Sequence, residues 1–260
     1  ESAGFNVVEY TYFDGKTRGV DFDGMVQSLE SFPKNTTVLL HACCHNPTGA
    51  DITEAQWRQV IEICKAKQLI PFLDIAYQGF ATGIEQDGIA VRMFAESGMS
   101  FFVSSSFSKS FSLYGERVGA LSIVTQSKDE SARVLSQLKR VIRTNYSNPP
   151  THGAAIAAAV LNSPELRKLW EDELAEMRDR IKAMRQGLVQ KLAAAGVKQD
   201  FAFIEAQRGM FSYSGLSAEQ VERLQKEDGI YALSTGRICV AALNTKNIDK
   251  VAKAIARVLA

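Results

Sequence analysis

Three apolar runs, separated by stretches with helical periodicity, constrain the fold of this chain more than any other feature. The runs are TVLLHACC at 37–44, LIPFLDIAY at 69–77 and MSFFV at 99–103. Between the first two, Thr53 and Gln56 form a capping box for a helix that extends to about Lys67. Such alternation is typical of an α/β domain, in which a mostly parallel sheet is flanked by helices.

Five further elements are expected in this part of the chain. They are a strand at 4–13, helices around 22–31 and 89–97, a strand at 119–124 and a helix from Ser127 to about Arg143. The motif NYSNPP ends the last helix, because two consecutive prolines cannot continue it.

A different organisation is expected towards the C-terminus. Pro164 opens a long helix, with apolar residues every three or four positions to about Ala195. Strands are then predicted at 201–207, 210–215, 229–235 and 236–243, with a helix capped by Ser217 and Gln220 and a final helix to Ala260. The predicted domains are a large domain at 1–170, a connecting helix at 171–195 and a smaller C-terminal α+β domain at 196–260.

Charge and hydropathy exclude several classes of partner. Thirty Lys and Arg residues against 29 Asp and Glu residues give a net charge of +1, so no global field attracts nucleic acid or an anionic membrane. No run approaches the roughly 18 apolar residues of a membrane span. The four cysteines show neither zinc nor disulfide spacing, which favours reduced thiols and a cytoplasmic protein.

One crowded group of metal-binding residue types lies at the end of the first apolar run. His41, Cys43, Cys44 and His45 are close in sequence. Alternate residues of a strand point to opposite faces, so this group is not expected to converge on one ion. No metal site is predicted.

The segment SSSFSKSFSLYGERVG at 104–119 carries the most specific chemistry. The amine of Lys109 can form a covalent bond with a carbonyl group, and the hydroxyls of Ser106 and Ser108 with the charge of Arg117 suit a phosphate dianion. Apolar runs on both sides fix the ends of the segment in a core. We therefore expect a covalently held phosphate cofactor rather than a solvated lysine.

Polar side chains at the ends of the other runs are expected beside Lys109. Asn46 follows the first run at a Pro–Gly turn, and Asp74 lies inside the second run, where an ionised carboxylate needs a partner. Tyr77 stands at the exit of that run. Parallel strands place ligand contacts at their carboxyl ends, so these side chains should share one rim with the lysine segment.

Six segments together resemble one known family. They are HACCHNPTG at 41–49, DIAYQGF at 74–80, SSFSKSFSLYGERVG at 105–119, RTNYSNPP at 143–150, RGMFSYSG at 208–215 and GRICVAAL at 236–243. In this order they are similar to the class I pyridoxal-phosphate-dependent aminotransferases, in the aspartate and aromatic amino acid branch, and closest to the bacterial aromatic enzymes. The resemblance implies the type I fold of pyridoxal-phosphate enzymes.

The resemblance also implies roles for individual residues. Lys109 would be cofactor tether and catalytic base, and Asp74 would hold the pyridine nitrogen protonated. Asn46 and Tyr77 would bond the ring oxygen, with Asn46 also at the substrate. Ser106, Ser108 and Arg117 would bind the phosphate, Arg237 the substrate α-carboxylate, and Phe211 would form a wall of the site.

A second subunit enters through the same resemblance. Arg143 would reach across a homodimer interface to the distal carboxylate of the substrate, with Ser147 near that boundary. Family members also carry a preceding segment with an N-terminal arm, a Gly-rich phosphate loop and an aromatic residue that stacks on the cofactor. No stretch before Asn46 matches these features, so the chain is expected to be the later portion of a longer enzyme.

The expected reaction is a ping-pong transfer of an amino group between an aromatic L-amino acid or L-aspartate and 2-oxoglutarate. Three alternatives remain open at this point: a strict aspartate aminotransferase, a lyase or decarboxylase on the same fold, and a catalytically silent fragment. Two arginines, one for each carboxylate of a dicarboxylic substrate, favour transamination.

Overall fold

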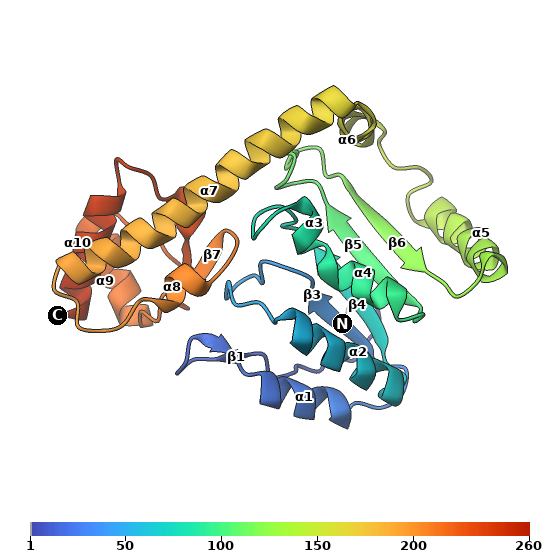
Figure 1. The fold of residues 1–260 in the computed structure, drawn as a ribbon, viewed down its shortest axis with the longest axis horizontal. Coiled ribbons are helices and arrows are strands. Elements are labelled where there is room, and N and C mark those ends of the chain that lie inside the picture. The colour runs from blue at the N-terminus through green and yellow to red at the C-terminus, as the bar shows by residue number, and fades with distance from the viewer. Residues whose placement is uncertain (1) are drawn as a thin grey trace.

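A four-stranded sheet with the order β3–β4–β5–β6 forms the centre of the computed structural model, which describes residues 2–260 (Figure 1). The strands are β3 (Thr37–His41), β4 (Ile70–Ile75), β5 (Phe101–Ser106) and β6 (Gly119–Val124). The first three are parallel and β6 is antiparallel to β5. The predicted α/β architecture with a mostly parallel sheet is confirmed.

Helices α1 (Phe22–Ser31), α2 (Glu54–Lys67) and α4 (Ile89–Glu96) lie where the periodicity predicted them. The short α3 (Ile84–Asp87) was not predicted. The capping box of Thr53 and Gln56 is present at the start of α2. The side chains of Trp57 and Phe94 meet edge to face, 6.2 Å between ring centroids, in the core beneath Phe101.

Three helices follow β6. They are α5 (Lys128–Asn145), α6 (His152–Asn162) and α7 (Pro164–Ala194). The sequence analysis missed α6, whose composition of small residues gives no clear apolar face. α5 has the expected bounds but no buried residue, and it stands apart from the other helices beside β6 (Figure 1).

The long helix α7 runs from the sheet to the C-terminal elements (Figure 1). These are α8 (Phe203–Ala206), β7 (Phe211–Tyr213), α9 (Ala218–Asp228), β8 (Arg237–Cys239), a 3-10 turn η1 (Val240–Ala242) and α10 (Ile248–Leu259). β7 and β8 form a two-stranded antiparallel sheet. The Ser217–Gln220 capping box begins α9 as predicted.

The strand predicted at 4–13 is wrong for most of its length. Only β1 (Phe13–Asp14) pairs, with β2 (Gly19–Val20). The apolar side chains of Phe5, Val7 and Val8 are each about two-thirds exposed, at 68%, 67% and 69%. Apolar and β-branched residues favour a strand only where a neighbouring edge offers hydrogen bonds, and residues 2–260 offer none here.

Two strand predictions near the C-terminus are also wrong. Residues 203–206 are helical because Phe201 and Ile204 are buried at helical spacing, and Asp200 accepts a hydrogen bond from the amide of Ala202. Residues 229–235 form no strand; Tyr231 is 78% exposed, and the amide of Leu233 bonds back to the carbonyl of Arg237. The other two strands predicted near the C-terminus, at 210–215 and 236–243, are present as β7 and β8 but are shorter than predicted. No helix in the described part of the chain is long and apolar enough to cross a membrane.

Candidate active site

The carboxyl ends of three parallel strands bring the predicted rim together. His41 of β3 is in register with Asp74 of β4, and Asp74 with Ser104 of β5. Asp74 therefore lies near the end of the central strand of these three, and it is half-buried. Its register partner, Ser104, lies two residues before Ser106. Asp74 was predicted inside an apolar strand that ends at this rim, and its role toward a cofactor stays a prediction.

A polar chain joins residues that are far apart in the sequence. The Nδ2 group of Asn46 donates to the hydroxyl of Tyr77 at 3.4 Å, and a guanidinium nitrogen of Arg237 donates to Asn46 Oδ1 at 2.9 Å. The guanidinium carbon also lies 4.6 Å from the ring centroid of Phe211, which meets Tyr77 edge to face at 6.2 Å. Asn46 thus links the large sheet to the β7–β8 hairpin.

Lys109 reaches this group from the turn after β5. Its Nζ lies 4.9 Å from the ring centroid of Tyr77, and the residue is half-buried. The following residue is held by Trp170 of α7, whose indole Nε1 donates to the carbonyl of Ser110 at 2.6 Å. The lysine amine therefore rests on the face of the Tyr77 ring, where a cation–π contact holds it beside the other residues of the rim.

The predicted phosphate-binding residues are only partly assembled. The hydroxyl of Ser106 accepts from the amide of Ser108 at 3.2 Å, and Ser108 is buried. Arg117 is exposed, with a left-handed φ of 52°, and its guanidinium donates to the carbonyl of Tyr114 at 3.1 Å. The arginine therefore turns back on its own loop.

Arg143 is not brought to the rim by this chain. It is exposed at the end of α5, where a guanidinium nitrogen donates to the hydroxyl of Ser147 at 2.5 Å. Every other predicted site residue lies on or next to the strand ends and the β7–β8 hairpin. The role of Arg143 in another subunit stays a prediction.

Burial sets the protonation of the groups around the rim. Desolvation raises the pKa of the Tyr77 hydroxyl, opposed by its bond from Asn46 and by the charge of Arg237. Burial lowers the pKa of His45 to about 3, and its ring stacks on Tyr12 at 4.0 Å. The pKa of His41 is also lowered by burial, although the charge of Asp74 opposes this effect. Both imidazoles are therefore neutral at pH 7.

Cys43 and Cys44 lie closer to a third metal-binding residue type than strand alternation predicted. β3 ends at His41, and Cys44 adopts a left-handed φ of 52°, so strand alternation does not apply to the two cysteines. Their Sγ atoms and the carboxylate of Asp87 lie within 4.8 Å of one another. That carboxylate accepts from the amides of Gly79, Ala81, Thr82 and Gly83, which accounts for its burial as a cap on the loop after Tyr77.

Sequence reasoning missed three charged residues around the site: Asp51, which is partly buried, and Asp87 and Arg185, which are buried. Asp51 accepts from the amides of Cys44 and His45, both at 2.7 Å, and so shapes the loop that carries Asn46. A carboxylate two residues after the PTG turn is a signal that could have identified it. Arg185 is a basic residue at a position where the pattern of α7 is otherwise apolar. That mismatch was the one signal in the sequence that pointed to it.

Comparison with known proteins extends over the whole chain. The family described as "Aminotransferase class I and II" matches residues 1–255. The aspartate aminotransferase of Pseudomonas aeruginosa is 66% identical and the aromatic-amino-acid aminotransferase of Escherichia coli 54% identical, over 100% and 99% of the chain. The chain spans 65% of the length of each of these relatives.

A solved structure gives the same result. The aromatic-amino-acid aminotransferase from Burkholderia pseudomallei, in a structure described as covalently bound to pyridoxal phosphate, is 70% identical and superposes with a TM-score of 0.99. The match covers 100% of this chain and 65% of that one. From these matches and the strand-end site, we conclude that the chain belongs to the class I and II aminotransferase family.

Proposed function

We propose that the protein to which this chain belongs is a pyridoxal-phosphate-dependent aminotransferase. It moves an amino group between an aromatic L-amino acid or L-aspartate and 2-oxoglutarate. The observation that supports this most is the contact chain from Lys109 over Tyr77 to Asn46 and Arg237. These contacts bring together a reactive amine, an aromatic ring and a guanidinium that can bind a carboxylate.

The residues present fit this cofactor. Lys109 would hold its aldehyde carbon, Asp74 its pyridine nitrogen, and Asn46 with Tyr77 its ring oxygen. The buried hydroxyl group of Ser108 and its neighbour Ser106 offer donors for the phosphate, and Arg117 could join them by leaving its bond to the Tyr114 carbonyl. When bound, the cofactor supplies an electron sink that stabilises negative charge on the substrate Cα.

The chain's own residues would bind the substrate and move its proton. Arg237 binds the α-carboxylate through its planar guanidinium, while Asn46 and Phe211 hold that guanidinium in place. With the carboxylate fixed, the Cα hydrogen faces the rim that carries Lys109. The lysine amine takes the Cα proton as a general base.

The remaining proposals concern assembly. We propose a cytoplasmic homodimer in which Arg143 of one subunit binds the distal carboxylate in the site of the other. Exposure of Arg143 and the absence of a buried residue on α5 support an interface or covering segment there. We also propose the domain division at 1–170, 171–195 and 196–260, which the course of α7 supports (Figure 1).

The substrate proposal can be tested on the full-length protein with pyridoxal phosphate. Formation of 2-oxo acids from L-aspartate, L-tyrosine and L-phenylalanine would be measured with 2-oxoglutarate as acceptor. Turnover of both classes is expected. Turnover of L-aspartate alone would identify a strict aspartate aminotransferase, and carbon dioxide release without 2-oxo acid would contradict transamination.

A further inference from the structure

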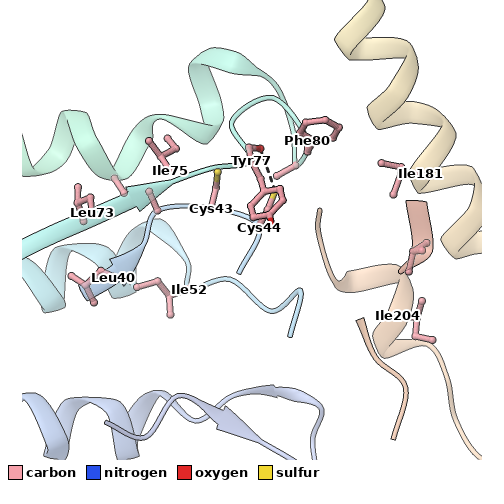
Figure 2. Close-up of a cluster of buried hydrophobic side chains, with 14 of the residues drawn as sticks. Leu40, Cys43, Cys44, Ile52, Leu73, Ile75, Tyr77, Phe80, Ile181 and Ile204 are labelled. Carbon is pink, nitrogen blue, oxygen red and sulfur yellow. Dashed lines mark hydrogen bonds between the residues drawn. The ribbon is translucent and has the colours of Figure 1, made fainter. Parts of the chain in front are cut away.

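Arg185 is the one buried basic side chain among residues 2–260, with 2% of its surface exposed. It lies on the apolar stripe of α7, between Ile181 and Leu188. Figure 2 shows the adjoining part of this core, in which Ile181 and Ile204 lie on the side opposite Phe80. A charge at such a position is costly unless its hydrogen-bonding groups are satisfied.

The guanidinium of Arg185 binds the backbone around β7. One nitrogen donates to the carbonyl of Ile204 at 3.0 Å and to the hydroxyl of Ser212 at 3.3 Å. The other donates to the carbonyls of Gly209 and Phe211, both at 2.8 Å. Four of its five N–H groups are thus used, and all the acceptors are neutral groups within the segment 204–212.

This segment packs without clearance against the loop that carries Asn46. A Cβ on Gly209 would lie 2.5 Å from Cβ of Cys44, and a Cβ on Gly49 would lie 2.6 Å from the carbonyl oxygen of Phe211. The amide of Arg208 also donates to the carbonyl of Gly49 at 2.7 Å. Any shift of the 204–212 backbone is therefore transmitted to the loop.

The same backbone carries the substrate-facing residues. Phe211 is bonded to Arg185 through its carbonyl, while its ring contacts the guanidinium of Arg237. Pairing of β7 with β8 places Tyr213 opposite Arg237, so the hairpin holds that arginine in register. Ser212, between them, is fully buried and hydrogen-bonded to both Arg185 and Gln207.

Arg185 and Asp51 carry opposite charges on the two sides of the contact between segment 204–212 and the Asn46 loop. Burial lowers the pKa of Arg185 to about 10, so it remains protonated at neutral pH, and the charge of Asp51 favours that form. Asp51 in turn holds the amides of Cys44 and His45. Asp51 therefore orders the loop that carries Asn46, and Arg185 orders the β7–β8 hairpin that carries Phe211.

We propose that Arg185 is a positioning residue for substrate binding, which fixes the Phe211–Arg237 hairpin against the Asn46 loop without touching the substrate. The assignment rests on the proposed function for the identity of the substrate. Cofactor binding is expected to be largely independent of Arg185, because Lys109, Asp74 and Ser108 are held by β4, β5 and the turn that follows.

The test compares Arg185→Met, Arg185→Lys and Lys182→Met in the full-length protein loaded with pyridoxal phosphate. Lys182 is the matched control, since it is an exposed cation on the same helix. Succinate, a dicarboxylate that cannot transaminate, would be titrated by calorimetry. R185M is expected to raise its Kd about 10- to 100-fold while the protein keeps its bound cofactor. R185K should show a smaller rise, because an ammonium cannot reach all the carbonyls, and K182M none.

Amide hydrogen exchange provides a readout that needs no ligand. R185M should speed exchange at 44–49 and 207–213 more than at β4 and β5. A wild-type Kd in R185M, or unchanged exchange in both segments, would overturn the proposal, even if the variant is less stable. If R185M does not fold, a raised Kd in R185K supports the proposal and a wild-type Kd rejects it.

The proposed function fails separately. Wild-type protein that shows no transamination would contradict the proposed function, while the exchange measurement on R185M would still decide the role of Arg185.

Discussion

The two sides of the candidate site differ in how far this chain completes them. On one side, hydrogen bonds and ring contacts join Asn46, Tyr77, Phe211 and Arg237, with the buried charge of Arg185 behind the hairpin. On the other, Arg117 bends back on its own loop and Arg143 bonds only Ser147. The contacts of the first side are made within residues 2–260 and join distant segments. In the same residues, Arg117 and Arg143 hydrogen-bond to groups within four positions of them.

The exposed fractions of the side chains also differ between the two sides of the site. Core residues of β3, β4 and β5 such as Leu40, Leu73 and Phe101 are buried. β6 has no buried residue, with Leu121 at 56% exposed, and α5 has none either. The exposed surfaces of β6 and α5 are therefore where the proposed homodimer would place its further contacts.

Loss of Lys109 should have the largest effect, because this residue serves both sides of the site. Lys109→Ala in the full-length protein should lower kcat by about 10,000-fold, since both the tether and the general base are removed. Single-turnover formation of 2-oxo acid measures the loss, and Lys182→Ala is the control. A rate within about tenfold of wild type would mean that another group moves the proton.

A charge on the apolar side of α5 tests whether the exposed region is covered in the full-length protein. Leu138→Asp should lower its free energy of unfolding by about 3 kcal/mol, because a buried carboxylate would have no partner. Urea denaturation measures the change. Gln137→Asp, on the same helix, should cost less than about 0.5 kcal/mol. Equal effects of the two variants would show that α5 stays exposed.

The tight contact on the completed side can be tested with a glycine pair. Gly209 and Gly196 have φ values of 78° and 79° in the left-handed region, but only Gly209 has a close neighbour. Gly196→Ala should cost about 1 kcal/mol from its backbone conformation alone. Gly209→Ala should cost about 2 kcal/mol more, because Cys44 must move. Thermal or urea unfolding compares them, and equal losses would refute the tight contact.

The smallest expected effect concerns pH. The pKa of His45 falls from 6.5 to about 3 on folding, so below pH 6.5 the unfolded state binds a proton that the folded state does not. The free energy of unfolding should therefore decrease as the pH falls, by about 1 kcal/mol between pH 7 and 5.5 from this residue. His45→Gln should lose that much less stability over the same interval. Parallel curves for both proteins would contradict the assignment.

Local patterns predicted those parts of the fold that depend on neighbouring residues in sequence. The capping boxes at Thr53 and Ser217 and the apolar stripe after Pro164 fixed three helices almost to the residue. Strand predictions failed at 4–13, 201–207 and 229–235, because apolar side chains alone do not supply a pairing edge. α6 was missed, since small residues carry little periodic signal.

The sequence by itself determined the chemistry: Lys109, Asp74, Asn46 and Arg237 stand in motifs whose residue types suit one cofactor and one carboxylate. Only the tertiary structure decided which of these meet. It joined Arg237 to Asn46 across 191 positions and placed Arg185 behind both. The physical reason is that a buried charge depends on the geometry of distant carbonyls and amides, which no local pattern encodes.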